Sequence, residues 1–322
     1  MTFRSSHLCV AATLASLAFA GASPSLNAAY AALPAGTACS ALLARPTLDS
    51  ISEAPAHIVS ARVVAAKYPN PEYCDLKGEI AGQIQFELRL PTSWNGRYLQ
   101  GSSAGPPGAV AGIRDCGVAL ERDFAVGFGN VGHTGAAIDG APHALALAAR
   151  VILSVFYGEP PHHAYLDGCS EGGKDALSEA QRYPNDFDGI IAVSPGHSWA
   201  GLSPDLSEFR NRGGKLIIWH GWADRTEPPA GAVGYYAAMR DRMGGLGTVQ
   251  TFARLFMFPG ISHCSATAPC PSCNLIEPLV SWVERGTAPN EVLFTEEETA
   301  PKTSPAFRYP MRTKRIASGS ID

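Results

Sequence analysis

The feature that most constrains the fold of this chain is the pentapeptide Gly168-Cys169-Ser170-Glu171-Gly172. It has the G-x-S-x-G pattern of a sharp turn that carries a serine from the end of a strand onto the start of a helix. The flanking residues agree with that geometry. His163–Asp167 predicts a short strand before the turn, and Gly173–Arg182 predicts a helix after it. The pentapeptide therefore predicts a strand–turn–helix unit that presents Ser170 at its apex.

The rest of the chain repeats this alternation of short apolar strands and helices. Such a pattern is typical of an α/β domain with a mostly parallel sheet covered by helices on both faces. A small-residue loop, Gly101–Gly105, follows one of the strands. We predict strands at 80–90, 97–100, 124–128, 163–167, 190–193, 215–220 and 254–258, and helices at 144–157, 173–182, 235–242 and 275–285.

Three side chains that together could activate a hydroxyl each follow a predicted strand. Ser170, Asp224 and His263 supply a nucleophile, an acid that orients the base, and the base, in the α/β-hydrolase order. A G-x-S-x-G string alone is a weak signal, but three role-matched residues at strand ends are a stronger one. Asp167 and Asp175 lie closer to Ser170 in sequence and compete for the acid role. Asp224 is favoured because it follows a separate strand.

Cysteines flank two of these three residues. Cys169 precedes Ser170 and Cys264 follows His263, so a bond between the two sulfurs would tie serine and histidine together. Removing Cys9 with the leader described below leaves an odd number, so one cysteine is unpaired or pairs elsewhere. The residues alone leave the connectivity open among Cys39, Cys74, Cys116, Cys169, Cys264, Cys270 and Cys273.

Residues 1–31 predict an export signal. Arg4 precedes an uncharged small-apolar run at 8–22, and Ala-x-Ala sites at 18–20 and 29–31 place cleavage near 20–31. The run is too short for a stable membrane span. We therefore expect a secreted or periplasmic protein in which residues 32–322 form a single catalytic domain. A net charge of −4 gives no reason to expect nucleic acid or a membrane as a partner.

Several further strings resemble the tannase/feruloyl esterase family, and the resemblance extends from about Cys39 to the end of the chain. The combination of Cys-Ser, Asp and His-Cys makes it specific. The strings are Gly168–Gly173, Arg182-Tyr183-Pro184, Phe187–Ala192, His220-Gly221-Trp222-Ala223-Asp224, Phe258–Cys264, Trp282–Gly286 and Pro289.

The resemblance implies an α/β-hydrolase fold and hydrolysis of aromatic-acid esters through an acyl-enzyme. Family members act on gallates, hydroxycinnamates and, in one branch, a terephthalate monoester. It also implies a Cys169–Cys264 disulfide that holds the histidine beside the serine, and a Cys39–Cys74 disulfide. The expected partner is a small aromatic ester, and no metal or organic cofactor is required. The natural acid, the alcohol and the oligomeric state do not follow from the sequence.

The chain departs from the family by lacking a lid. Members carry a domain between the strand after the nucleophile helix and the Asp-bearing strand, whereas Pro195 to Lys215 leaves about twenty residues, too few for a domain. The calcium site and most aromatic-ring contacts of the lid should be absent with it. An open, less selective site is expected, with Trp199 and Trp222 as candidate pocket residues, while Trp219 belongs to the core together with Phe256 and Phe258.

Two further departures concern the oxyanion loop and the C-terminal cysteines. One oxyanion donor should be the N–H of Glu171, the residue after the nucleophile. The other should come from Gly101–Gly105, which is less glycine-rich than in the family, and we assign it to Ser103 with Ala104 as the next choice. A missing donor costs about two to three orders of magnitude in rate. The family's cysteine near the C-terminal Tyr-Pro is absent, so Cys270 and Cys273 are expected to pair with each other.

The cysteines also allow three other kinds of site: a zinc site, a redox site and a cysteine nucleophile. Cys264, Cys270 and Cys273 beside His263 could form a zinc cluster, but their spacing is unlike that of structural zinc sites, and export favours disulfides. A redox role for the Cys-x-x-Cys is weaker still, because no thioredoxin-like context surrounds it. Cys169 as nucleophile is disfavoured because its place before the turn apex points it away from substrate.

The histidines His133, His162 and His163 are interpreted as loop or surface residues.

A function other than catalysis also stays open. Loss of the lid and of the glycine-rich oxyanion loop favours a catalytically weak or inactive relative that binds an aromatic ester or plant polymer. The complete set of Ser170, Asp224 and His263 favours an enzyme, because a binding module has no need of all three.

Overall fold

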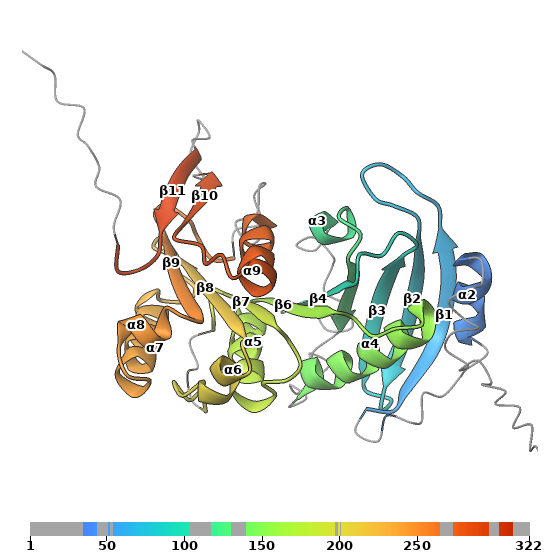
Figure 1. Cartoon of the computed structure of the whole chain (residues 1–322), viewed down its shortest axis with the longest axis horizontal. Helices are drawn as coiled ribbons and strands as arrows, with labels where there is room; N and C mark the ends of the chain where they lie inside the picture. The colour runs from blue at the N-terminus through green and yellow to red at the C-terminus, as the bar shows by residue number, and fades with distance from the viewer. Residues whose placement is uncertain are drawn as a thin grey trace, which may run out of the picture.

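A computed structural model describes residues 35–43, 51, 54–103, 117–129, 140–196, 199, 201–264, 273–295 and 303–311. Within these residues a nine-stranded sheet runs through the molecule, and a two-stranded hairpin lies beside its far end (Figure 1). The strands are β1 (Ala56–Val64), β2 (Tyr73–Ile80), β3 (Ile84–Pro91), β4 (Arg97–Ser103), β5 (Ala125–Gly129), β6 (His163–Cys169), β7 (Gly189–Val193), β8 (Lys215–Gly221), β9 (Ala253–Phe258), β10 (Glu291–Thr295) and β11 (Thr303–Phe307).

Helices cover both faces of the large sheet. Figure 1 shows α3 and α9 on one side and α4, α5 and α6 on the other. The long α4 begins at the proline-containing turn after Gly140 and ends at Gly158, two positions that take positive φ angles. The helices are α2 (Ala35–Leu43), α3 (Gly117–Leu120), α4 (Ala141–Tyr157), α5 (Glu171–Arg182), α6 (Ser207–Asn211), α7 (Ala230–Arg242), α8 (Leu246–Val249) and α9 (Cys273–Arg285).

The strand order of the large sheet is β1-β2-β3-β5-β4-β6-β7-β8-β9. Strands β5, β4, β6, β7, β8 and β9 are parallel to one another, whereas β1, β2 and β3 form an antiparallel extension at one end. The predicted α/β architecture with a mostly parallel sheet is confirmed. Because β6 to β9 are neighbours and parallel, the loops after β6, β8 and β9 open on the same edge of the sheet.

Consecutive residues of the central strands pack on opposite faces of the sheet. Leu166 and Ile190 belong to the hydrophobic cluster beneath α4 and α5. Their neighbours Tyr165 and Ile191 belong to the cluster beneath α9. All four side chains are buried, which explains why these strands read as continuous apolar runs in the sequence.

Some predicted boundaries were wrong. The strand predicted at 80–90 is present from Ile84 onward as β3, but its first residues do not belong to it: β2 ends at Ile80, and Ala81 and Gly82 turn the chain with φ angles of 51° and 66° before β3 begins. The helix predicted at 235–242 begins earlier, at Ala230. The residues 101–103, predicted as the start of a loop, continue β4 because they pair with β6. The antiparallel β1 and the hairpin β10–β11 were not predicted.

The N-terminal helix is linked covalently to the sheet. Cys39 of α2 and Cys74 of β2 form a disulfide with a Cα–Cα distance of 5.6 Å, which confirms the predicted pair. The predicted leader, Cys116 and Cys270 lie outside the described residues, as does the Cys273 side chain. No helix in the described part of the chain has the length and apolar character needed to cross a membrane.

Candidate active site

Ser170 lies at the apex of a strained turn between β6 and α5. Its φ and ψ angles are 59° and −120°, a conformation that few side-chain-bearing residues adopt. The turn is fixed from both sides, because the Ser170 N–H donates to the Val193 carbonyl at 3.0 Å and the Gly196 N–H donates to the Ser170 carbonyl at 3.0 Å. The predicted strand–turn–helix unit is therefore present, with its geometry held by the end of β7.

Two glycines make this turn possible. A Cβ on Gly168 would lie 2.0 Å from the Gly172 carbonyl oxygen, and a Cβ on Gly173 would lie 2.5 Å from the Val193 carbonyl oxygen. Both contacts are with backbone atoms, which cannot swing aside as a flexible side chain could. The glycine requirement of the motif is thus steric: α5 begins so close to β6 and β7 that no side chain fits at these positions.

Asp224 and His263 meet at the ends of neighbouring strands. Asp224 lies in the turn after β8 and His263 in the segment after β9, and the Nδ1 atom of His263 lies 2.8 Å from Oδ2 of Asp224. The Asp224 side chain has no exposed surface, whereas that of His263 is 21% exposed. A proton on Nδ1, donated to the carboxylate, leaves Nε2 of His263 as the basic nitrogen.

The Asp224 carboxylate is kept ionised by its hydrogen bonds. Its Oδ1 atom accepts the backbone N–H groups of Thr226 and Glu227 at 2.9 and 2.8 Å. Burial alone would raise the pKa of Asp224, but the Glu227 N–H and the His263 ring outweigh it, so the pKa is lowered. The acid that pairs with His263 is therefore Asp224, and the competing Asp167 and Asp175 do not take this place.

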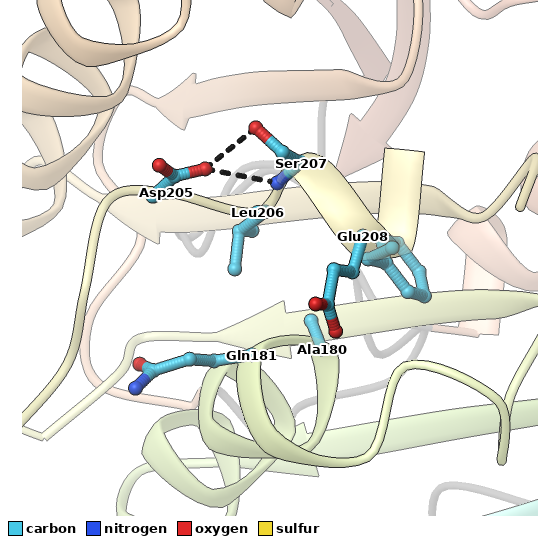
Figure 2. Close-up of a pocket in the computed structure, with 7 residues that line it drawn as sticks. Ala180, Gln181, Asp205, Leu206, Ser207 and Glu208 are labelled. Carbon is cyan, nitrogen blue, oxygen red and sulfur yellow. Dashed lines mark hydrogen bonds between the residues drawn. The ribbon is translucent and has the colours of Figure 1, made fainter. Parts of the chain in front are cut away.

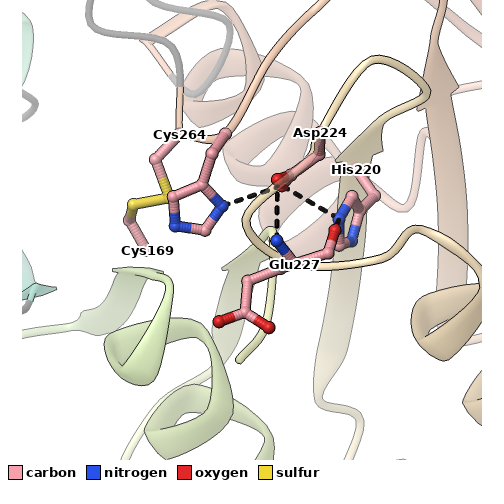
Figure 3. Close-up of a disulfide and its surroundings, with 6 residues drawn as sticks. Cys169, His220, Asp224, Glu227 and Cys264 are labelled. Atoms are coloured by element: carbon pink, nitrogen blue, oxygen red, sulfur yellow. Dashed lines mark hydrogen bonds and ion pairs between the residues drawn. A yellow bond between two sulfur atoms is a disulfide. The ribbon is translucent and has the colours of Figure 1, made fainter. Parts of the chain in front are cut away.

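A disulfide connects the serine turn to the histidine segment (Figure 3). Cys169 and Cys264 are bonded, with a Cα–Cα distance of 6.1 Å, as the family resemblance implied. The bond attaches the residue before Ser170 to the residue after His263. It also means that Cys169 is not available as a nucleophile and that Cys264 is not available as a zinc ligand.

The two predicted oxyanion donors lie at the start of α5 and at the end of β4. Glu171 is the first residue of α5, where backbone N–H groups have no partner within the helix. Ser103 is the last residue of β4 and is paired with Cys169, next to the nucleophile. Ala104 and the rest of that loop lie outside the described residues. The assignment of both donors stays a prediction.

The aromatic residues near this edge differ in exposure. Trp219, Phe256 and Phe258 are fully buried in the core, as predicted. Trp222 follows β8 and is 50% exposed, two residues before the acid of the candidate triad. Trp199 is half-buried and stacks on Tyr235 of α7, with ring centroids 5.3 Å apart, so much of its surface already packs against the protein. Their roles in substrate binding stay predictions.

Two of the other histidines considered in the sequence, His162 and His163, lie away from the site. His162 and His163 stand at the start of β6, at the opposite edge of the sheet from Ser170, and lie 3.4 and 3.9 Å from the carboxylates of Glu159 and Asp188. His133 lies outside the described residues. The interpretation of His162 and His163 as peripheral residues agrees with these positions.

A further group of potential metal ligands joins α4, α5 and the segment before β7. Ligand atoms of His143, Glu179 and Asp186 all lie within 4.8 Å of one another. His143 Nδ1 is 2.5 Å from Asp186 Oδ2, a hydrogen-bonding distance that leaves no room for an ion between these two atoms. The three side chains therefore form a polar network linked by the His143–Asp186 hydrogen bond. No sequence motif indicated this group, because its members come from three separate elements.

A cavity of about 340 Å³ lies between the C-terminal end of α5 and the segment that enters α6 (Figure 2). Asp205 Oδ1 accepts both the N–H and the hydroxyl of Ser207 at its rim. None of the lining residues belongs to the candidate triad, so the cavity is separate from the site. The lining residues are Ala180, Gln181, Asp205, Leu206, Ser207, Glu208 and Phe209.

A family model described as tannase and feruloyl esterase matches residues 64–203 and 201–322. The chain belongs to this family. Mono(2-hydroxyethyl) terephthalate hydrolase from Piscinibacter sakaiensis is 36% identical over 130 residues, covering 38% of this chain and 21% of that protein. A probable feruloyl esterase from Arthroderma benhamiae is 37% identical over 120 residues, covering 34% of this chain and 22% of that protein. The matched part of this family member thus spans about a fifth of the length of each of those relatives.

Solved structures of similar fold include feruloyl esterase B from Aspergillus oryzae, with a TM-score of 0.69, 16% identity and coverage of 82% of this chain and 95% of that one. Tannin acyl hydrolase from Aspergillus niger has a TM-score of 0.63, 16% identity and coverage of 84% and 93%. At these identities the likeness establishes the fold alone, and this family member has the predicted α/β-hydrolase fold.

Proposed function

We propose that this family member is an exported serine hydrolase of carboxylic esters, with Ser170, His263 and Asp224 as its catalytic triad. The observation that carries the proposal is the 2.8 Å contact between His263 Nδ1 and the buried carboxylate of Asp224. The Cys169–Cys264 disulfide supports it, because it attaches that histidine segment to the turn that bears the serine. Strain at Ser170 supports it further, since such backbone conformations concentrate at functional sites.

The proposed reaction proceeds in two steps. Ser170 attacks the ester carbonyl while His263 Nε2 takes the hydroxyl proton, and His263 then protonates the leaving alcohol. A water molecule, deprotonated by the same histidine, attacks the acyl-enzyme, and His263 returns that proton to the Ser170 oxygen as the acyl–oxygen bond breaks and the acid leaves. Asp224 holds His263 in the required tautomer and stabilises its cation. Backbone N–H groups of Glu171 and of the Ser103 region would hold the oxyanion.

The proposed substrates are esters of small aromatic acids. The names of two similar proteins specify a terephthalate ester and feruloyl esters, both of them esters of aromatic acids. The half-exposed ring of Trp222 beside the triad offers an apolar surface for such an acyl group. The described residues of the 194–214 segment, which connects β7 to β8, form the short α6, and the segment is too short for a lid domain. We therefore propose an open site with broad selectivity for the acyl group.

Export is proposed from two independent features. Residues 1–31 have the pattern of a signal peptide, and two disulfides are present in the described part of the chain. The catalytic groups of the proposed reaction are all supplied by side chains and backbone N–H groups, so the mechanism calls for no cofactor. A secreted or periplasmic location can be tested by fractionating cells that express the full chain.

The function is tested with a short p-nitrophenyl ester and with methyl ferulate, using wild type and Ser170→Ala. We expect hydrolysis of both esters by wild type and loss of hydrolysis in the variant. Labelling by an organophosphonate gives a second readout, since only an activated serine reacts. Wild type that is neither labelled nor active would favour the binding-protein alternative, and activity that survives in the variant would refute the role of Ser170.

A further inference from the structure

His220 is a buried neighbour of the candidate triad with no assigned role. It lies near the end of β8, and its side chain has no exposed surface. Its Nε2 atom is 3.1 Å from Asp224 Oδ2, the same oxygen that contacts His263, and 2.9 Å from the backbone carbonyl of Glu227 (Figure 3). The ring therefore touches both ends of the turn that carries the acid.

The partners of His220 define where its proton resides. The Asp224 carboxylate and the Glu227 carbonyl are both acceptors, so Nε2 must carry hydrogen. The Nδ1 atom is buried without a hydrogen-bond partner among the described residues. Burial lowers the pKa of His220 more than the Glu227 carbonyl and the Asp224 charge raise it. The ring is thus a neutral donor at neutral pH, and it leaves the negative charge of Asp224 intact for His263.

Without His220, the contacts of the carboxylate would be one-sided. Oδ1 of Asp224 accepts the N–H groups of Thr226 and Glu227, whereas the partners of Oδ2 among the described residues are the rings of His263 and His220. His263 lies in the segment after β9 and changes charge during the proposed reaction. His220 is part of a central strand, so it supplies a fixed reference for Oδ2.

We propose that His220 is a positioning residue that fixes the Asp224 carboxylate, through its Nε2–H and the Glu227 carbonyl, so that Oδ2 faces His263. This inference rests on the proposed function of the triad. The residue never contacts substrate and exchanges no proton during turnover. Its effect is on the orientation of the acid and, through it, on the tautomer and direction of the base.

The arrangement has an electrostatic consequence that separates positioning from packing. The titratable groups that face His220 are Asp224 in the turn after β8 and His263 after β9, while Glu227 faces it with its backbone carbonyl. The His220 Nε2–H and the His263 Nδ1–H share one oxygen. Removing the first donor frees the carboxylate to turn, which lowers kcat, and it also leaves Oδ2 more basic, so its charge stabilises the His263 cation more and the acid limb of kcat/KM should move to higher pH.

The test compares His220→Gln with His220→Met. The glutamine amide can place an N–H where Nε2 stands, whereas methionine fills a similar volume without a donor. For the methionine variant we expect a loss in kcat of about 10- to 100-fold, the range for one hydrogen bond to a charged group, with little change in KM and with the acid limb moved up. The glutamine variant should recover most of the kcat and the wild-type pH profile.

Equal losses in both variants with an unchanged pH profile would show a packing role only, and a methionine variant with wild-type kcat would remove the role altogether. If the methionine variant does not fold, as judged by circular dichroism, His220→Asn replaces it. The amide of asparagine reaches the position of Nδ1 and not that of Nε2. The glutamine variant should therefore keep most of the wild-type kcat, and the asparagine variant should not.

A readout independent of turnover separates this inference from the proposed function. The proton between His263 and Asp224 is followed by NMR in wild type and both variants. We expect its resonance to move downfield in the methionine variant and to stay in place in the glutamine variant. If the resonance moves in this way but the protein hydrolyses no ester, the positioning role of His220 is supported and the proposed function is refuted. If the resonance does not move in an enzyme that is active, the proposed function is supported and the positioning role is refuted.

Discussion

Replacing the buried carboxyl of Glu179 with an amide should stabilise the protein above mildly acidic pH. Glu179 lies on α5 with 2% of its surface exposed, and its Oε2 atom has no hydrogen-bond partner among the described residues. Burial, followed by the charge of Asp186, raises its pKa from 4.5 to about 9. The side chain is therefore protonated in the folded protein at neutral pH, and its ionisation is favoured only after unfolding.

The sign and size follow from that difference. The folded-state pKa is raised, so the carboxyl's contribution to stability is complete below pH 4.5 and is lost as the pH rises toward 9. At pH 7 the unfolded chain gains about 3 kcal/mol by ionising this group, at about 1.4 kcal/mol per pH unit. A glutamine cannot ionise in either state. Glu179→Gln should thus raise stability at pH 7 by up to about 3 kcal/mol, or on the order of 6–10 °C in Tm.

The assay is thermal unfolding at pH 5, 7 and 8.5. The gain of Glu179→Gln over wild type should be small at pH 5 and should grow with pH. The control is Glu121→Gln, the same chemical change at an exposed position, which should give no pH-dependent gain. A variant less stable than wild type at pH 7 would refute the reasoning. It would show that the carboxylate is ionised and paired in the folded protein.

Three further predictions concern the site. Gly168→Ala should abolish activity and lower Tm, because the added Cβ would lie 2.0 Å from a backbone oxygen. The control is Gly234→Ala, where a Cβ meets no atom within 4 Å, and this variant should fold and stay active. Equal activity and equal Tm in the two variants would contradict the steric argument. Replacing Cys169 and Cys264 together by alanine should lower both kcat and the unfolding free energy, the latter by about 4 kcal/mol for a loop of this length, as measured by guanidinium unfolding; an unchanged kcat would mean that the bond does not position the histidine. Asp224→Asn should reduce kcat by about three to four orders of magnitude in ester hydrolysis with little effect on KM, and a loss below tenfold would argue that another acid serves.

Local chemistry made the serine turn and the alternation of elements predictable. Ser170 stands between a strand and a helix, and glycine at 168 and 173 is required by contacts within a few residues or with the adjacent strand. The central strands are buried on both faces, so each appears as an apolar run that can be recognised without knowing its neighbours. The two disulfides were also expected, because the cysteine positions matched a family in which they pair.

The contact between Asp224 and His263, the contact with His220 and the burial of Glu179 were decided by tertiary structure. Asp224 meets His263 because β8 and β9 are adjacent and parallel, a pairing that hydrophobic runs do not encode. The start of the strand predicted at 80–90 was wrong for a related reason: the turn that precedes β3 depends on Ala81 taking a positive φ, a conformation that an alanine in the sequence does not indicate. A sequence specifies local backbone preferences, whereas the neighbours of a side chain, and hence its charge and role, follow from the order in which distant strands assemble.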